Sequence, residues 1–214
     1  MPTVKRVLDL FCGGGGASMG YHRAGYEVTG VDIKHGKRYP FTYMRRDVMT
    51  LTVEELQEYD LIHASPPCQT HSITKNLRIA QGKSTSKLDL IEPVRELLRA
   101  SGKPYIMENV PGAPLVDPVL LCGSAFGLQV RRHRLFESNV ELKGVYCDHK
   151  SQGRPIGVYG SLNDEIPRGG KTAENIGQAR DAMGISWLIW SELVEAIPPA
   201  YTEYLGKQVL NANR

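Results

Sequence analysis

The sequence predicts an α/β fold built on a mostly parallel β-sheet, and three observations support this. Short apolar runs alternate with helical patterns over the first two thirds of the chain, as in parallel sheets with crossover helices. Several of these runs stop at a glycine, a proline or an acidic residue, where a strand is expected to meet a loop. The 214 residues, 41% of them hydrophobic and 23% charged, suit one globular domain over 1–214 and are too few for two.

The first part of the chain contains four predicted strands and two short helices. Thr52 and Glu55 have the spacing of a capping box, which marks the start of the second helix. In chain order we expect a strand over Arg6–Phe11, a helix over Ala17–Ala24, strands over Tyr26–Asp32 and Thr42–Arg46, a helix from Thr52 to about Glu58, and a strand over Leu61–Ser65.

The second part of the chain is less regular. An apolar face at helical spacing predicts a helix over Leu88–Ala100, and a strand follows over Pro104–Glu108. Glycine, proline and charged residues then become frequent from Pro111 to Lys171, so the strand signal there is weak. Helical patterns return over Thr172–Met183 and from Ser191, and a proline pair opens a last helix that ends near Asn211.

Charge and cysteine content exclude several classes of protein. Lys and Arg number 26 against 23 Asp and Glu, and this mild excess permits a nucleic-acid partner without indicating one. The four cysteines are not closely spaced, so we predict neither a CxxC zinc site nor a disulfide framework. No apolar stretch approaches the roughly 20 residues of a membrane helix, and the N-terminus lacks a signal-peptide pattern. We expect a soluble, intracellular, cytoplasmic protein.

A glycine turn over Gly13–Gly16 separates the first strand from the first helix. Asp32 ends the second strand 19 residues after Gly13, where an acid can accept hydrogen bonds from ribose hydroxyls. The G-x-G-x-x-G/A fingerprint of dinucleotide sites is incomplete. With Gly13 and Gly15 as its first two glycines, Ser18 stands where the last glycine or alanine is required. S-adenosylmethionine (SAM) has no pyrophosphate and suits a looser turn. A dinucleotide-dependent dehydrogenase and a plain tight turn remain alternatives.

A cysteine follows two prolines at the end of a predicted strand, in the run Ser65-Pro66-Pro67-Cys68-Gln69. The prolines end the strand and stiffen a loop at the edge where cofactors bind. Methyltransferases of exocyclic amines carry an aromatic residue after such a proline pair, whereas Cys68 offers a nucleophile. A free thiol has a pKa of about 8.5 and needs activation for this role. A small buried core cysteine is the alternative.

Glu108 and Asn109 end the next predicted strand. Consecutive parallel strands end at one edge of a sheet, so Glu108 and Cys68 can share a cleft. An acid in that position can protonate or hydrogen-bond a substrate nitrogen. The alternative is a carboxylate that caps the following turn.

Together these motifs resemble the cytosine-C5 DNA methyltransferase family. The sequences Asp9-Leu-Phe-Cys-Gly-Gly-Gly-Gly, Pro67-Cys68-Gln69, Glu108-Asn109-Val110 and Arg132-His133-Arg134 follow one another in the family's order. The resemblance covers about residues 5–137 and 172–206. It implies a Rossmann-like SAM-dependent fold and methyl transfer from SAM to C5 of cytosine in DNA.

The resemblance also implies roles for single residues. Cys68 would add to C6 of a cytosine flipped out of the duplex, because stacking shields the ring. Glu108 would contact N3 and the exocyclic amine, with Asn109 supporting the loop. Arg132 and Arg134 would hold the O2 side of the base or a phosphate. The polar, basic stretch 70–87 resembles the mobile loop that closes over the base.

The implied cofactor site is formed mainly by residues that follow strands. The Asp32 carboxylate would bind the ribose hydroxyls, and Asp47 would accept from the adenine amine. The remaining residues would pack on the adenine, approach the cofactor with their backbone, or contact its methionine end. The full set is Phe11, Gly13, Gly14, Gly16, Asp32, Ile33, Asp47, Val48 and Pro66.

Three features depart from the family pattern. Val130 stands where the family has Gln before its arginine pair, and a Gly-Asn pair of the C-terminal part is missing near Glu195–Tyr201. Only about 35 residues, 138–172, occupy the place of the target-recognition region. We therefore expect a short or relaxed DNA target, or recognition supplied by a partner protein or a second copy. Cys147 and His149 supply two metal ligands, too few for a zinc site.

The small recognition segment leaves two other functions open. The same chemistry could act on RNA or on a free cytidine nucleotide. A homologue that binds nucleic acid without turnover is the third possibility, although the complete set of catalytic residues argues against it. A restriction-modification role and a regulatory role would look alike in this sequence.

Overall fold

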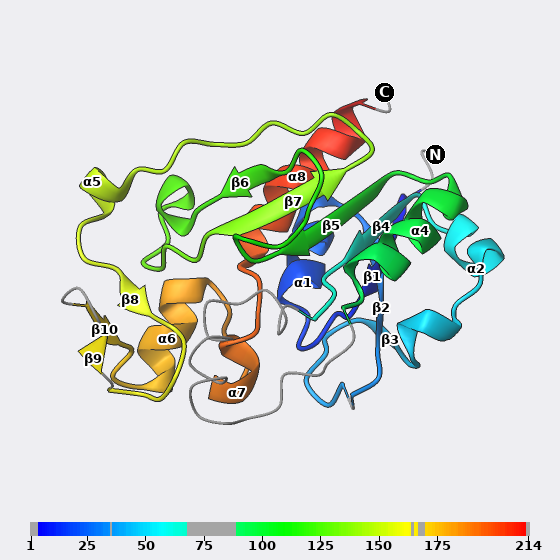
Figure 1. The fold of residues 1–214 in the computed structure, drawn as a ribbon. Helices are drawn as coiled ribbons and strands as arrows, with labels where there is room; N and C mark the ends of the chain where they lie inside the picture. Colours follow the sequence, from blue (N-terminus) through cyan, green and yellow to red (C-terminus); the bar gives the residue numbers. More distant parts are fainter. Residues whose placement is uncertain (1–3, 35, 68–88, 164, 167–169, 213–214) are drawn as a thin grey trace.

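The computed structural model describes residues 4–34, 36–67, 89–163, 165–166 and 170–212 (Figure 1). Cys68 and the predicted mobile loop over 70–87 lie outside the described residues, as does the predicted start of a helix at Leu88.

The main sheet has seven strands in the order β3-β2-β1-β4-β5-β7-β6. The first five strands along the chain run parallel, and β7 runs antiparallel to both β5 and β6. This arrangement confirms the predicted Rossmann-like fold, and the five strands predicted from sequence agree with the structure within one residue at each end. The strands are β1 (Arg6–Leu10), β2 (Glu27–Asp32), β3 (Thr42–Arg45), β4 (Leu61–Ala64), β5 (Tyr105–Asn109), β6 (Val119–Leu121) and β7 (Arg134–Ser138).

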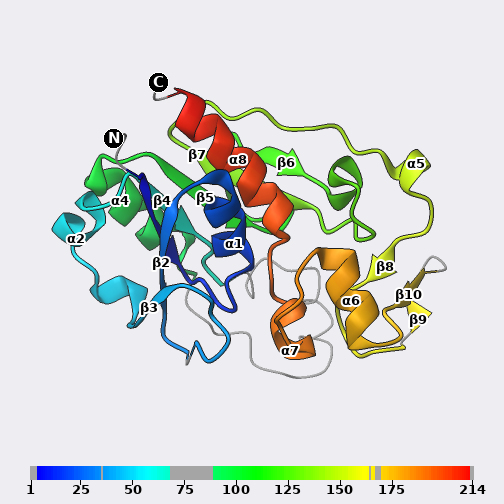
Figure 2. The same ribbon diagram turned by 180° about the vertical axis from the view of Figure 1, so that it is seen from behind.

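Helices cover both faces of this sheet (Figures 1 and 2). Successive strand residues point to opposite faces, so Val7 packs in the cluster under one helix layer and Leu8 in the cluster under the other. One layer consists of α1 (Gly16–Ala24) and α8 (Pro199–Ala212), and the other of η1 (Val48–Thr50), α2 (Val53–Gln57) and α4 (Ile91–Ser101). The predicted capping box is confirmed, since Thr52 and Glu55 exchange both hydrogen bonds.

A small lobe lies beside the carboxyl edge of the main sheet (Figure 1). It contains a three-stranded sheet of order β8-β10-β9 and two helices, packed around their own buried cluster. Its elements are β8 (Ile156–Gly157), β9 (Glu165–Ile166), β10 (Gly170–Thr172), α6 (Ile176–Met183) and α7 (Trp190–Leu193). The predicted recognition segment 138–172 therefore supplies only the strands of this lobe, and later helices complete it.

The start predicted for the helix over Thr172–Met183 is wrong. Thr172 pairs with Gly157 in the small sheet, and the helix begins only at Ile176. The Asn175 side chain accepts a hydrogen bond from the Gln178 backbone N–H and caps this later start. In the described part of the chain, no helix is long and apolar enough to span a membrane.

One buried ion pair joins α4 to the antiparallel edge of the sheet. Arg95 and Glu137 are 3% and 2% exposed, and two N–H groups of the guanidinium donate to the two carboxylate oxygens at 2.8 Å each. The Glu137 carboxylate also accepts from the Tyr105 hydroxyl at 3.1 Å and from the Val116 backbone N–H at 2.8 Å. Removing Arg95 would leave the buried Glu137 carboxylate with hydrogen bonds but without the opposite charge that it pairs with here.

We expect Arg95→Met to lower the free energy of unfolding by about 3–5 kcal/mol. The matched control is Lys5→Met, which breaks the exposed Lys5–Asp60 pair and is expected to cost less than about 1 kcal/mol. Urea unfolding of both variants checks the prediction. Equal small losses would contradict it. The double variant Arg95→Met/Glu137→Leu is expected to recover part of the loss, because no charge remains buried.

Candidate active site

The predicted site residues converge on the carboxyl edge of the parallel strands. Gly13 follows β1, Asp32 ends β2, Pro66 follows β4 and Glu108 lies near the end of β5. These strands are neighbours in the sheet, so their ends meet although they are far apart in sequence. The fold thus places the predicted cofactor residues beside the predicted catalytic acid.

Glu108 forms a buried pair with Arg134 from the start of β7. Arg134 Nε lies 2.9 Å from Glu108 Oε1. Burial raises the pKa of Glu108 above its ordinary value, although the charges of Arg134 and Arg132 and a hydrogen bond from Ser65 act in the opposite direction. Because burial outweighs these opposing effects, the Glu108 carboxyl keeps its proton to a higher pH than an ordinary glutamate and can act as an acid toward a substrate nitrogen.

Asn109 connects the end of β5 to the loop after β4. Its Nδ2 donates to the Pro66 carbonyl at 3.0 Å, and its Oδ1 accepts from the Val110 backbone N–H at 2.9 Å. Asn109 is 1% exposed, so both groups need these partners. The bond fixes the backbone two residues before Cys68, which itself lies outside the described residues.

Arg132 lies between the main sheet and the small lobe. Its guanidinium donates to the carbonyls of Val158, Leu193 and Val194, all from the small lobe and its exit. The Tyr201 hydroxyl donates to the Arg132 carbonyl at 2.9 Å and supports a left-handed backbone with φ of 37°. These contacts tie the lobe to the main sheet, whereas Arg134 is the arginine that touches Glu108.

Asp32 is held ready to accept hydrogen bonds. Its carboxylate accepts from the backbone N–H groups of Gly13 at 3.0 Å and Lys34 at 2.9 Å. Ile33 next to it is 64% exposed and offers an apolar surface, and Phe11 adopts φ of 59° at the glycine turn. An oriented carboxylate beside exposed apolar groups suits the ribose and adenine of an adenosine cofactor.

The other predicted cofactor residues have mixed surroundings. The Asp47 side chain is exposed and caps η1 by accepting from the Met49 backbone N–H at 3.0 Å. Val48 is 2% exposed and packs in the core under α4. Pro66 is buried in the loop held by Asn109.

Residues from the C-terminal part of the chain pack so closely against Gly14 and Gly16 that a side chain would not fit at either position. A Cβ at Gly14 would lie 2.5 Å from Leu188, and one at Gly16 would lie 2.4 Å from the Ile197 carbonyl oxygen. Trp187 Nε1 also donates to the Gly14 carbonyl at 2.9 Å. The turn is therefore closed by this segment despite its missing Gly-Asn pair. Sequence reasoning missed Trp187, because it lies between two predicted helical patterns and no local pattern shows what it contacts.

Two buried titratable groups lie under the site. His63 is fully buried between the Tyr21 hydroxyl and the Ser65 hydroxyl, each 2.9 Å from a ring nitrogen, and burial lowers its pKa to about 3. Asp9 is 1% exposed and accepts from the Ser18 hydroxyl. Burial raises the pKa of Asp9 to about 7, helped by nearby carboxylates and opposed by Ser18.

These two groups are expected to have opposite effects on stability. As pH falls below about 6.5, the unfolded chain protonates His63 and the folded chain does not, so stability is lost. Above about pH 4 the unfolded chain ionises Asp9 while the folded chain keeps its proton, so stability is lost as pH rises toward 7. Between about pH 4 and 6.5 the contributions of His63 and Asp9 to the pH dependence of stability are therefore opposite and cancel in the unmodified protein.

A variant that removes one of the two groups should therefore reveal how the other makes the free energy of unfolding depend on pH. We expect Asp9→Asn to lose about 2 kcal/mol of stability between pH 6.5 and 5, relative to the unmodified protein, because the contribution of His63 is then no longer offset by that of Asp9. His63→Gln is expected to gain a similar amount over the same interval. Urea unfolding at several pH values measures both. Profiles parallel to that of the unmodified protein would contradict the assignment.

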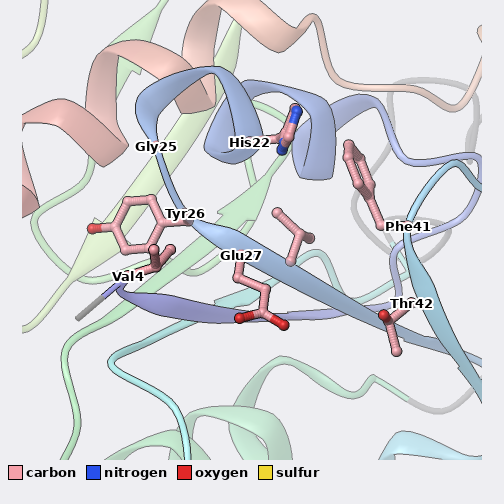
Figure 3. Close-up of a pocket in the computed structure, with 8 residues that line it drawn as sticks. Val4, His22, Gly25, Tyr26, Glu27, Phe41 and Thr42 are labelled. Atoms are coloured by element: carbon pink, nitrogen blue, oxygen red, sulfur yellow. The ribbon is translucent and has the colours of Figure 1, made fainter. Parts of the chain in front are cut away.

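A hollow on the surface lies at the opposite end of the strands (Figure 3). Val4 precedes β1, Glu27 begins β2 and Thr42 begins β3, so its lining residues mark the amino ends of these strands. The predicted site residues follow the carboxyl ends. The hollow is therefore separate from the candidate active site.

The fold is Rossmann-like, and the predicted cofactor residues and Glu108 lie at one edge of its main sheet. The chain belongs to the C-5 cytosine-specific DNA methylase family, whose model matches residues 5–136. It is 33% identical over 115 residues to the Type II methyltransferase M.FnuDI of Fusobacterium nucleatum, covering 50% of this chain and 33% of that protein. It is 29% identical over 126 residues to M.AquIA of a Picosynechococcus strain, covering 50% and 49%.

Solved structures share the fold over the whole chain. A prophage protein of E. coli described as a DNA modification methyltransferase aligns with a TM-score of 0.68 at 16% identity, covering 99% of this chain and 100% of that one. The Dnmt2 methyltransferase of S. pombe aligns with a TM-score of 0.63 at 13% identity, covering 99% and 100%. At such identities these likenesses show the fold alone.

Proposed function

We propose that the chain transfers a methyl group from SAM to C5 of cytosine in DNA through a covalent bond between Cys68 and C6. The observation that carries the proposal is the buried Glu108–Arg134 pair at the carboxyl edge, beside the loop that leads to Cys68. Membership of a family of cytosine-specific DNA methylases supports the base and the reacting atom.

The chemistry of cytosine explains why these groups are needed. C5 is a poor nucleophile while the ring is aromatic. Addition of the Cys68 thiolate to C6 breaks that aromaticity and places electron density on C5, which then accepts the methyl group. Loss of the C5 proton and expulsion of the thiolate restore the ring. Glu108 donates a proton or hydrogen bond to N3 and so stabilises the charge that addition creates.

SAM supplies an electrophilic methyl group when it is bound. Asp32 would hold its ribose hydroxyls, and the exposed Ile33 would pack on its adenine. Arg134 would orient Glu108 and hold the O2 side of the base, and Asn109 would fix the loop before Cys68. The base must leave the duplex to reach this buried acid. The matched region spans 33% and 49% of the two relatives named above. Because the recognition segment 138–172 is short, we assign it recognition of a short DNA target, with a partner or second copy supplying the rest.

The proposal is tested by incubating the protein with methyl-labelled SAM and, separately, duplex DNA, single-stranded DNA, RNA and free cytidine nucleotides. Each product is digested to nucleosides and the label is located by mass spectrometry. We expect label on C5 of deoxycytidine from duplex DNA. Label confined to RNA or nucleotides would contradict the proposal that DNA is the substrate. If SAM binds but no product carries label, the proposal that this chain catalyses the transfer by itself is wrong.

A further inference from the structure

Two cysteines and two histidines from separate segments meet beside the start of β7. Each offers one ligand atom, and the four atoms all lie within 4.8 Å of one another. The Cys122 sulfur is 3.3 Å from His149 Nε2, and the Cys147 sulfur is 3.3 Å from His133 Nε2. None of these residues belongs to the proposed active site.

The sheet and a following helix bring the four residues together. Leu121 of β6 pairs with Arg134 of β7, so the next pair along the two strands is Cys122 and His133. The chain then returns after β7 and places Cys147 and His149 against them, with His149 opening α5 (His149–Gln152). The sequence could not show this, because the paired ligands come from distant positions.

Hydrogen bonds anchor the returning segment independently of its cysteine and histidine. The Asp148 backbone N–H donates to the Ser124 hydroxyl at 3.0 Å. Gln152 Nε2 donates to the carbonyls of Leu128 at 2.8 Å and Val130 at 2.9 Å. The ligand atoms are therefore held near one another by the surrounding fold.

The arrangement fits a tetrahedral metal site. Zinc binds sulfur at about 2.3 Å and imidazole nitrogen at about 2.0–2.1 Å, which places ligand atoms roughly 3.3–3.8 Å apart. The two sulfur–nitrogen contacts of 3.3 Å lie at the short end of this range, and all four ligand atoms lie within 4.8 Å of one another, so small movements bring them to tetrahedral spacing. Two thiolates also balance the charge of a divalent ion, which matters because arginines flank His133 on both sides.

We propose that Cys122, His133, Cys147 and His149 bind one zinc ion. Two sulfur and two imidazole ligands favour zinc over magnesium or calcium, which prefer oxygen. Four protein ligands leave no open position, so the ion is structural. It joins the β6–β7 edge to the segment that leads into the small lobe, and it holds His133 between Arg132 and Arg134. This replaces the sequence-based expectation that the chain has no metal site.

The test uses untagged protein produced in zinc-supplemented medium and dialysed against metal-free buffer. We expect elemental analysis to find one zinc ion per chain. Cys147→Ser alters an exposed ligand and is expected to fold but to lose most of the zinc. His22→Gln is the matched control, because His22 is exposed on α1 and lies outside the cluster, and it should retain one zinc ion.

Two further measurements keep the test decisive if a variant folds poorly. Cobalt added to the metal-free protein should give the visible absorption of tetrahedral cobalt with thiolate ligands. Zinc returned after chelation should raise the thermal midpoint of the unmodified protein and leave that of Cys147→Ser unchanged. Absence of stoichiometric zinc together with absence of the cobalt spectrum would overturn the proposal. An intact mass showing a disulfide between Cys122 and Cys147 would also overturn it.

Discussion

Cys68→Ala is expected to abolish methyl transfer to cytosine while leaving the binding of SAM intact. Without the thiolate, C6 receives no nucleophile and C5 stays part of an aromatic ring. Of the predicted cofactor residues, Gly13 follows β1 and Asp32 ends β2, so their hydrogen bond does not depend on this side chain. Transfer of labelled methyl groups and calorimetric titration with SAM measure the two properties separately.

A second cysteine provides the control for thiol chemistry. Cys12 is buried, and burial together with the nearby Asp9 and Asp32 raises the pKa of its thiol far above the ordinary value. Such a thiol cannot supply the thiolate at neutral pH, so Cys12→Ala should keep methyl transfer. DNA containing 5-fluorocytosine should trap a covalent complex with Cys12→Ala and none with Cys68→Ala. Normal methylation by Cys68→Ala would contradict the mechanism.

The parallel sheet, and the meeting of the predicted site residues at one of its edges, could be predicted because their signals are local. Each strand is a short apolar run that stops at a turn residue, and Asp32, Pro66 and Glu108 stand at or next to these stops. Parallel topology then brings them to one edge. The capping box at Thr52 was equally visible, because both partners lie within one helical turn.

The small lobe could not be predicted in the same way. Its strands have only two or three residues, so no alternation of apolar and polar residues can develop. Its core also contains Val130, which precedes the strands in the sequence, and Leu193, which follows them. A segment predicted as a 35-residue insertion over 138–172 is therefore part of a unit that the sequence does not delimit.

Arg132 and the glycine turn show a second reason why local patterns are insufficient. Arg132 stands in a motif that predicts contact with substrate, and the structure adds that its donors bind carbonyls of residues much later in the chain. Gly14 and Gly16 predict close approach to a ligand, and the structure adds that Leu188 and Ile197 fill the space that a side chain at either position would need. The residue types indicated that these positions matter, but the residues that contact them are brought there by tertiary packing and could not be predicted.

Glu108→Gln is expected to lower the rate of methyl transfer by about 10²- to 10⁴-fold, the usual contribution of a general acid. The glutamine amide can still donate a hydrogen bond to N3, but it has no proton to transfer. The variant therefore separates proton transfer from hydrogen bonding, and Glu108→Ala removes both. Single-turnover rates with labelled SAM measure the effect, and the thermal midpoint checks that the loss of the Arg134 ion pair has not unfolded the chain.

The pH dependence of the rate gives a sharper outcome. The carboxyl carries its proton below its raised pKa, so the rate of the unmodified protein should fall as pH rises through that value. In Glu108→Gln the rate should no longer fall at high pH. It should still rise with pH as the Cys68 thiol ionises. Ser65→Ala removes a hydrogen bond that lowers the pKa of Glu108, so its descending limb should move to higher pH. A descending limb that persists in Glu108→Gln would assign the proton to another group.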